Sequence, residues 1–190
     1  MNVCVYGASS TQIDQQYITI TELLGETLAK ANHTLVYGAG GAGLMGAVAR
    51  GMTRGGGKVI GVVPSFLKVD GILYEYCNEM VYTETMRERK QIMDERSDAF
   101  VVTPGGIGTY EEFFEMYTLK QLGRHKKPII IFNINGYYDR LLDMLQYTVD
   151  ERFMQKKSME LITVATTPEE VLEQLSCPVE DIDIKETKFV

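Results

Sequence analysis

Residues 98–122 restrict the possible folds of this chain more than any other stretch, because a strand, a glycine-rich turn and a helix start follow one another there. The apolar run 99–102 is typical of a buried parallel strand. Three glycines in the turn at 104–108 permit unusual backbone conformations and leave no Cβ to block a ligand. The N–H groups of the next helical turn have no partners within the helix and lie at the positive end of its dipole. The stretch therefore predicts a phosphate-binding site made of backbone.

Thr109 and Glu112 also allow a purely structural interpretation of this stretch. T-x-x-E is the pattern of a capping box, in which the glutamate side chain folds back onto the N–H of the cap residue. On spacing alone, this role and a catalytic role for Glu112 carry equal weight. The glycine density favours ligand binding, because a helix cap does not require Gly-Gly-x-Gly before it.

Strand and helix patterns alternate along the whole chain, which predicts an α/β fold: a single-domain, Rossmann-like, doubly wound parallel sheet with helices on both faces. We expect a catalytic domain over residues 1–176 and a C-terminal extension over 177–190. In such sheets ligands bind beyond the carboxyl ends of the strands, where the turns at Gly7, Gly38 and Gly105 can converge. The expected strands are 2–6, 34–37, 58–63, 79–82, 98–102, 128–132 and 161–164.

The turn 38–43 has the formal spacing G-x-G-x-x-G between a strand and a helix. A dinucleotide site of this kind needs an acidic residue at the tip of the next strand, which here ends in Pro64 and Ser65. NAD is therefore disfavoured. A close helix–strand contact explains the glycines equally simply, and we favour a turn that lines one side of a mononucleotide pocket. The weakly patterned segment 65–78 is expected to be a surface loop, with a flap over that pocket as one role.

Composition excludes several classes of partner. The net charge of −7 argues against a nucleic-acid surface, although local N–H groups can still hold a small anion. No apolar run reaches the length of a membrane span, and the N-terminus lacks a signal-peptide pattern. The three scattered cysteines, Cys4, Cys77 and Cys177, resemble the free thiols of cytoplasmic proteins. We therefore expect a cytoplasmic protein without nucleic-acid or membrane partners.

Other catalytic chemistries lack their residues in this sequence. His33 and His125 are the only histidines, and neither belongs to a metal-binding pattern. There is no G-x-S-x-G nucleophile elbow. No lysine has the surroundings expected of a pyridoxal phosphate site. We accordingly expect neither a metal nor an organic cofactor.

Four short motifs carry a resemblance to a known family. They are P-G-G-x-G-T-x-x-E at 104–112, M-R-E-R-K at 86–90, G-L-M-G at 43–46 and G-Y-Y at 136–138. Together they resemble the LOG family of cytokinin riboside 5′-monophosphate phosphoribohydrolases, often described as lysine decarboxylase-like, from about Val3 to about Leu175. The chain departs from the family pattern at three positions. Arg87 replaces the histidine of M-H-x-R-K, and Ala8 and Ala39 stand where glycine is common.

The resemblance implies hydrolysis of the N-glycosidic bond of an N6-substituted adenosine 5′-monophosphate, with release of the free base and ribose 5-phosphate. It makes Glu112 the catalytic carboxylate, and the enzyme a homodimer. Two alternatives stay open at this stage: a non-catalytic nucleotide or cofactor carrier of the same fold, and a nucleosidase that is indifferent to the N6 group.

Arg89 and Lys90 illustrate how the resemblance changes an interpretation. From the residues alone they belong to a solvated cluster of mixed charges. With the family motif, Arg89 becomes a catalytic residue beside Glu112, and Lys90 a substrate contact. The full set of expected substrate-binding residues is Ser9, Gly43, Met86, Lys90, Gly105, Gly106, Ile107, Gly108, Thr109, Tyr110, Glu111 and Thr118.

Overall fold

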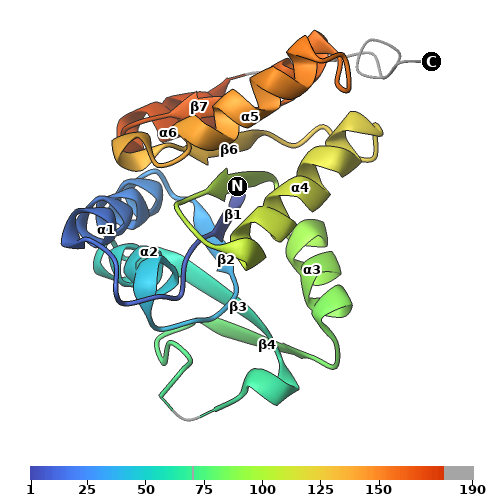
Figure 1. The fold of residues 1–190 in the computed structure, drawn as a ribbon. Coiled ribbons are helices and arrows are strands. Elements are labelled where there is room, and N and C mark those ends of the chain that lie inside the picture. The colour runs from blue at the N-terminus through green and yellow to red at the C-terminus, as the bar shows by residue number, and fades with distance from the viewer. Residues whose placement is uncertain (70, 178–190) are drawn as a thin grey trace.

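Seven parallel strands form one sheet in the order β4-β3-β2-β1-β5-β6-β7 (Figure 1). This computed structural model describes residues 1–69 and 71–177. The extension expected at 177–190 therefore lies, apart from Cys177, outside the described residues. The strands are β1 (Asn2–Tyr6), β2 (Thr34–Tyr37), β3 (Lys58–Pro64), β4 (Glu79–Thr83), β5 (Ala99–Val102), β6 (Ile129–Phe132) and β7 (Thr163–Ala165).

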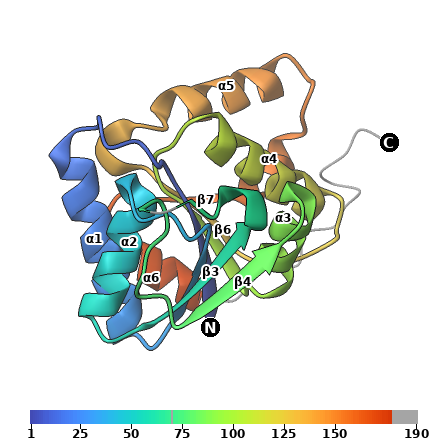
Figure 2. The ribbon, with the colours of Figure 1, turned by 90° about the horizontal axis from the view of Figure 1, so that it is seen from below.

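Helices cover both faces of the sheet, so the prediction of a doubly wound α/β fold is confirmed. Figure 2 shows α1 and α2 on one side of the strands and α3 and α4 on the other. Each face has its own apolar core: Leu24 and Met52 belong to one, Phe113 and Leu145 to the other. The helices are α1 (Gln15–Lys30), α2 (Gly43–Arg54), α3 (Met86–Glu95), α4 (Ile107–Gln121), α5 (Asp139–Asp150) and α6 (Pro168–Ser176).

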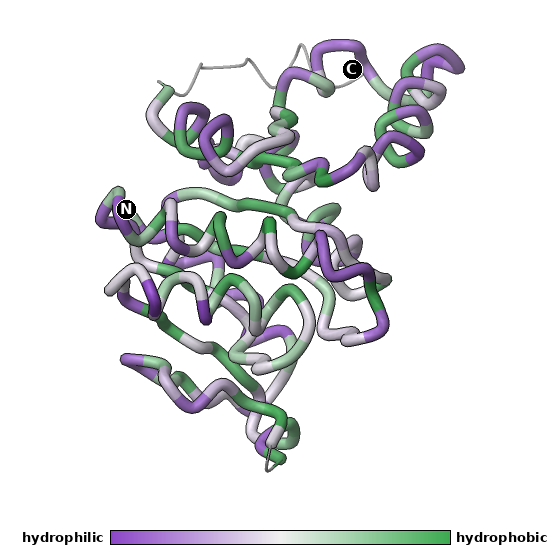
Figure 3. The backbone as a smooth tube through the Cα atoms, turned by 90° about the vertical axis from the view of Figure 1, so that its left-hand side faces the viewer, coloured by the Kyte–Doolittle hydropathy of each residue, from purple (hydrophilic) through white to green (hydrophobic). Residues whose placement is uncertain are grey.

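The central strands are apolar throughout because both of their faces are covered. All four residues of β5 and all four of β6 are buried. Such strands show continuous hydrophobic runs rather than alternation, and Figure 3 shows the hydrophobic colour concentrated along the strands. Of the helices in the part of the chain that the structure describes, none combines the length and apolar character needed to cross a membrane.

The order of the strands reverses between β1 and β5, the two neighbours at the centre of the sheet. At such a switch point the following loops diverge to opposite faces and leave a crevice beyond the strand ends. Here the two loops are hydrogen-bonded to each other. The N–H of Ala8 donates to the carbonyl of Pro104 at 3.0 Å, and the hydroxyl of Thr103 donates to the carbonyl of Tyr6 at 2.8 Å.

The turn before α2 is hydrogen-bonded to the loop after β1. The N–H of Leu44 donates to the carbonyl of Ala8 at 2.8 Å. Gly43 has φ +57°, and a Cβ at this position would lie 2.5 Å from that same carbonyl oxygen. Only glycine can adopt this positive φ and also leave room for the carbonyl of Ala8 without strain. The predicted convergence of three sequence-distant turns is therefore confirmed.

The last predicted strand differs from the structure, whereas the predicted surface loop at 65–78 is confirmed. The last strand was expected at 161–164 but is Thr163–Ala165, because Leu161 ends a 3-10 helix, Lys156–Leu161. Leu161 and Ile162 are both buried, so their apolar character alone does not show that the strand begins after them. The segment 65–78 contains a 3-10 turn at Ser65–Leu67 and is held against the glycine turn after β2, where the N–H of Gly41 donates to the carbonyl of Ile72 at 2.8 Å.

Candidate active site

The glycine turn after β5 presents an open helix N-terminus. Gly106 is the cap residue of α4, and it is exposed together with Ile107 and Gly108. A Cβ on Gly106 or Gly108 would meet no atom within 4 Å. A Cβ on Gly105, in contrast, would lie 2.1 Å from the side-chain oxygen of Thr109. Gly105 is thus required for packing, whereas the two open glycines leave the first amides of the helix accessible to an anion.

The capping-box interpretation of Thr109 and Glu112 is wrong. Helix α4 begins at Ile107, so Thr109 is its third residue, and its side chain is buried. Gly106 occupies the cap position without any side-chain hydrogen bond. The carboxylate of Glu112 faces Arg89 instead. The helix therefore begins three residues earlier than the T-x-x-E spacing suggests.

Arg89 reaches the site from α3, a helix capped by the side chain of Thr85. Its guanidinium Nη2 lies 3.8 Å from Oε1 of Glu112, and both side chains are almost fully buried. The Nε–H donates to the carbonyl of Val62 at 3.2 Å. A Cβ on Gly38 would lie 1.9 Å from Nη2 of Arg89. The glycine after β2 therefore makes room for the guanidinium, a role that the sequence pattern did not reveal.

Burial raises the pKa of Glu112 to about 7. The positive charge of Arg89 opposes this rise, and the negative charge of the neighbouring Glu111 adds to it. A carboxyl group with a pKa near neutrality can hold or release a proton under physiological conditions. A buried carboxyl group whose pKa is shifted in this way, beside a specific charged partner, is a candidate for catalysis.

Lys90 lies next to this pair but has partners of its own. Its ammonium forms ion pairs with the carboxylates of Glu111 and Glu115, the latter at 2.8 Å. These contacts connect α3 with α4 beside the Arg89–Glu112 pair. A substrate phosphate would therefore have to compete with two carboxylates for Lys90.

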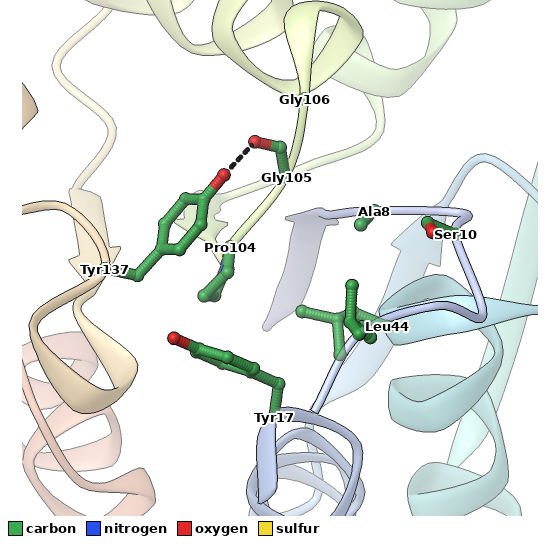
Figure 4. Close-up of a pocket in the computed structure, with 9 residues that line it drawn as sticks. Ala8, Ser10, Tyr17, Leu44, Pro104, Gly105, Gly106 and Tyr137 are labelled. Carbon is green, nitrogen blue, oxygen red and sulfur yellow. Dashed lines mark hydrogen bonds between the residues drawn. The ribbon is translucent and has the colours of Figure 1, made fainter. Parts of the chain in front are cut away.

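An apolar cavity of about 170 Å³ lies on the other side of the glycine turn (Figure 4). The ring of Tyr137 forms one wall, and Tyr17 packs edge-on against it at 6.0 Å between centroids. The hydroxyl of Tyr137 donates to the carbonyl of Gly105 at 2.7 Å. The other lining residues are Ala8, Ser10, Ile13, Leu44, Pro104 and Gly106.

Most of the expected site residues gather around this turn, although some of them lie at its edge. Ser9 is exposed in the turn after β1, and its neighbour Ser10 lines the cavity. Met86 is exposed, with its sulfur 3.9 Å from Nη1 of Arg89. Thr118 is exposed on α4, almost two turns beyond Glu112, and is not among the residues that line the cavity. In the sequence Tyr137 is part of the G-Y-Y motif, but its hydrogen bond to the carbonyl of Gly105 was not predicted.

Fold and site together define the class: a Rossmann-like α/β protein with a glycine-rich helix start at its switch point and a buried arginine–glutamate pair beside it. The sequence profile of a family described as "possible lysine decarboxylase" matches residues 45–175. A probable cytokinin riboside 5′-monophosphate phosphoribohydrolase of Oryza sativa subsp. japonica (LOGL6) is 40% identical over 91% of this chain and 69% of its own length. The enzyme LOG2 of Arabidopsis thaliana is 36% identical over 91% of this chain and 81% of its own length. The chain belongs to the LOG family of cytokinin riboside 5′-monophosphate phosphoribohydrolases.

Solved structures share the fold at lower identity. The molybdenum cofactor binding protein of Rippkaea orientalis matches 90% of this chain and 91% of its own, with a TM-score of 0.67 and 22% identity. The molybdenum cofactor carrier protein of Chlamydomonas reinhardtii matches 92% of this chain and 96% of its own, with a TM-score of 0.69 and 19% identity. At these identities the likeness concerns the fold alone.

Proposed function

We propose that the protein hydrolyses the N-glycosidic bond of adenosine 5′-monophosphates, N6-substituted ones included, and releases the free base and ribose 5-phosphate. One observation carries the proposal: the buried Arg89–Glu112 pair lies beside an open, glycine-lined helix N-terminus. The amides of that terminus suit a 5′-phosphate, and the carboxylate suits the sugar next to it.

In the proposed reaction the bond between C1′ and the purine nitrogen breaks, and its electron pair leaves with the base. Positive charge then develops on the ribose ring, as in other glycoside hydrolyses. The carboxylate of Glu112 stabilises this charge and accepts a proton from the water that forms the new bond to C1′, and the departing base takes up one proton, so that one water is consumed for each bond broken. Arg89 holds Glu112 in place and favours its ionised form, because an opposite charge lowers a carboxyl pKa.

The remaining expected contacts stay predictions within this scheme. The amides of Gly106, Ile107 and Gly108 are assigned to the phosphate. Lys90 is assigned to the substrate, for which it has to exchange one of its carboxylate partners. The other members of the set are Ser9, Gly43, Met86, Gly105, Thr109, Tyr110, Glu111 and Thr118.

We also propose a cytoplasmic homodimer that works without nucleic acid or membrane. Exposed apolar side chains on α3 and α4 support a subunit interface near the site: Met86 is 39% and Ile107 is 84% exposed. The three cysteines are free, which suits a reducing compartment. Light scattering of the purified protein tests the dimer, and a monomer mass at micromolar concentration would contradict it.

The function is tested by incubating the protein with AMP and with N6-isopentenyl-AMP and separating the products by chromatography. We expect free base and ribose 5-phosphate in equal amounts. Binding of either nucleotide without base release would instead indicate a carrier. Equal turnover of the two substrates would indicate a nucleosidase that ignores the N6 group.

A further inference from the structure

Two neighbouring tyrosines, Tyr137 and Tyr138, hold the loop that follows β5 by the same kind of bond. The hydroxyl of Tyr137 donates to the carbonyl of Gly105 at 2.7 Å. The hydroxyl of Tyr138 donates to the carbonyl of Thr103, also at 2.7 Å. Both side chains come from the segment after β6, where Gly136 has φ +71°. The loop is thus fixed at two carbonyl groups by one short piece of chain.

The two bonds differ in what lies on the far side of each peptide unit. The carbonyl of Thr103 belongs to a peptide whose nitrogen is that of Pro104, which has no hydrogen. The carbonyl of Gly105 belongs to a peptide whose nitrogen is the N–H of Gly106. No peptide bond in the described residues is cis, and in a trans peptide the N–H points opposite to the C=O. A bond that fixes the Gly105 carbonyl therefore also fixes the direction of the Gly106 N–H.

This peptide unit would rotate easily without a restraint. Its orientation depends on ψ of Gly105 and φ of Gly106, and both residues are glycines with wide conformational freedom. Gly106 is exposed at the cap of α4, and a Cβ added there would touch nothing within 4 Å. Among residues 1–69 and 71–177, no backbone acceptor receives its N–H. The bond from Tyr137 is consequently a restraint on a peptide that faces open space.

The ring of Tyr137 is well placed to act as this restraint. It packs edge-on against Tyr17 at 6.0 Å and against Tyr138 at 5.0 Å between centroids. Figure 4 shows its hydroxyl directed at the carbonyl of Gly105, with Tyr17 below it and the turn of Ala8 opposite. Two aromatic contacts thus limit the rotation of the side chain that makes the bond.

We propose that Tyr137 is a positioning residue for the 5′-phosphate: its hydroxyl holds the Gly105–Gly106 peptide so that the Gly106 N–H donates to the anion. The inference rests on the proposed function, since it assumes a phosphorylated substrate at the helix N-terminus. It concerns binding of the phosphate and not cleavage of the glycosidic bond, so Tyr137 acts through the backbone and does not touch the reacting atoms.

Binding is measured by titration calorimetry with AMP and with adenosine, in a Glu112→Gln background that removes turnover. Adding Tyr137→Phe should weaken AMP binding about 3- to 10-fold, the loss expected for one hydrogen bond, and leave adenosine binding unchanged. Adding Tyr138→Phe is the matched control, because it removes an equal bond to a carbonyl with no N–H behind it. It should leave the ratio of AMP to adenosine affinity as it is, even where it lowers the melting temperature.

In the otherwise native protein, Tyr137→Phe should raise KM for AMP by a similar factor with little change in kcat. An unchanged ratio of AMP to adenosine affinity in Tyr137→Phe would overturn the inference, as would an equal loss in Tyr138→Phe. The proposed function is tested separately, because it fails if the native protein releases no base. The ratio of AMP to adenosine affinity can be measured without catalysis.

Discussion

The two sides of the glycine turn are built on opposite principles. On the side of β2 and β3, Arg89 and Glu112 form a buried charged pair that contacts Val62 and the turn at Gly38. On the other side, Tyr137 lines an apolar cavity together with Tyr17 of α1 and Leu44 of α2. One turn of backbone thus separates a region suited to reaction chemistry from a region suited to holding the turn in shape.

The two sides also differ in their effect on folding. Burying a carboxyl group disfavours its charged form, which is why the pKa of Glu112 rises to about 7. Packing two aromatic rings edge-on is favourable in itself. The buried charges therefore reduce stability at neutral pH, whereas the aromatic contacts help to hold the turn in place.

The largest expected effect is on the charged side. Glu112→Gln keeps the shape of the side chain and removes its charge, so base release from AMP should fall about 10²- to 10⁴-fold, the range for loss of a general base or charge stabiliser. Product chromatography measures this loss. Tyr147→Phe, a change at an exposed tyrosine of α5, serves as control and should keep full activity. Full base release by Glu112→Gln would refute the assigned role.

Substitutions in the glycine turn should have a smaller effect on activity. Gly106→Ala adds a Cβ where nothing lies within 4 Å, at an ordinary φ of −94°, so the protein should fold as before. The added methyl group stands before the open amides, and we expect KM for AMP to rise about tenfold, by the loss of roughly one charge-assisted hydrogen bond. Gly105→Ala makes the contrast, since its Cβ would lie 2.1 Å from the Thr109 side chain and should lower the melting temperature. An unchanged KM in Gly106→Ala would contradict the phosphate assignment.

A smaller change concerns the pH dependence. Turnover should rise as pH increases through about 7, because the role proposed for Glu112 requires its ionised form and its pKa is about 7. Arg89→Gln removes the charge that lowers the pKa of Glu112, so the residual activity should rise at higher pH than in the native protein. Glu111→Gln removes a charge that raises this pKa, and its profile should move to lower pH. Profiles that coincide for all three proteins would show that another group controls the rate.

The last prediction concerns stability alone. The folded-state pKa of Glu112 lies above its ordinary value of 4.5, so the native protein binds more protons than the unfolded chain between about pH 4.5 and 7. Stability contributed by this group is present below pH 4.5 and is lost as pH rises through 7. Between pH 4.5 and pH 8 the free energy of unfolding of Glu112→Gln should therefore rise relative to that of the native protein by on the order of 3 kcal/mol. Denaturant titrations of both proteins at the two pH values measure these free energies. If the difference between variant and native protein is the same at both pH values, the prediction is wrong.

Much of the fold could be predicted because its signals are local. The apolar runs of β5 and β6 indicate strands that are buried on both faces. Thr167 followed by Pro168 indicates the start of α6. The ends of the segments were harder to predict, as at Leu161, which is buried like Ile162 although the strand begins only at Thr163. The start of α4 was missed by three residues because the cap pattern at Thr109 is present but the helix is capped at Gly106.

By itself the sequence determined the alternation of strands and helices, the glycine turn and, through its motifs, the family, since all of these depend on residues close together in the chain. Only the tertiary structure decided that Arg89 of α3 meets Glu112 of α4 over the space left by Gly38, and that burial there raises the pKa of Glu112. It likewise decided that Tyr137 holds the carbonyl of Gly105. These facts depend on contacts between distant segments, and strand order and burial, which no local pattern contains, bring those segments together.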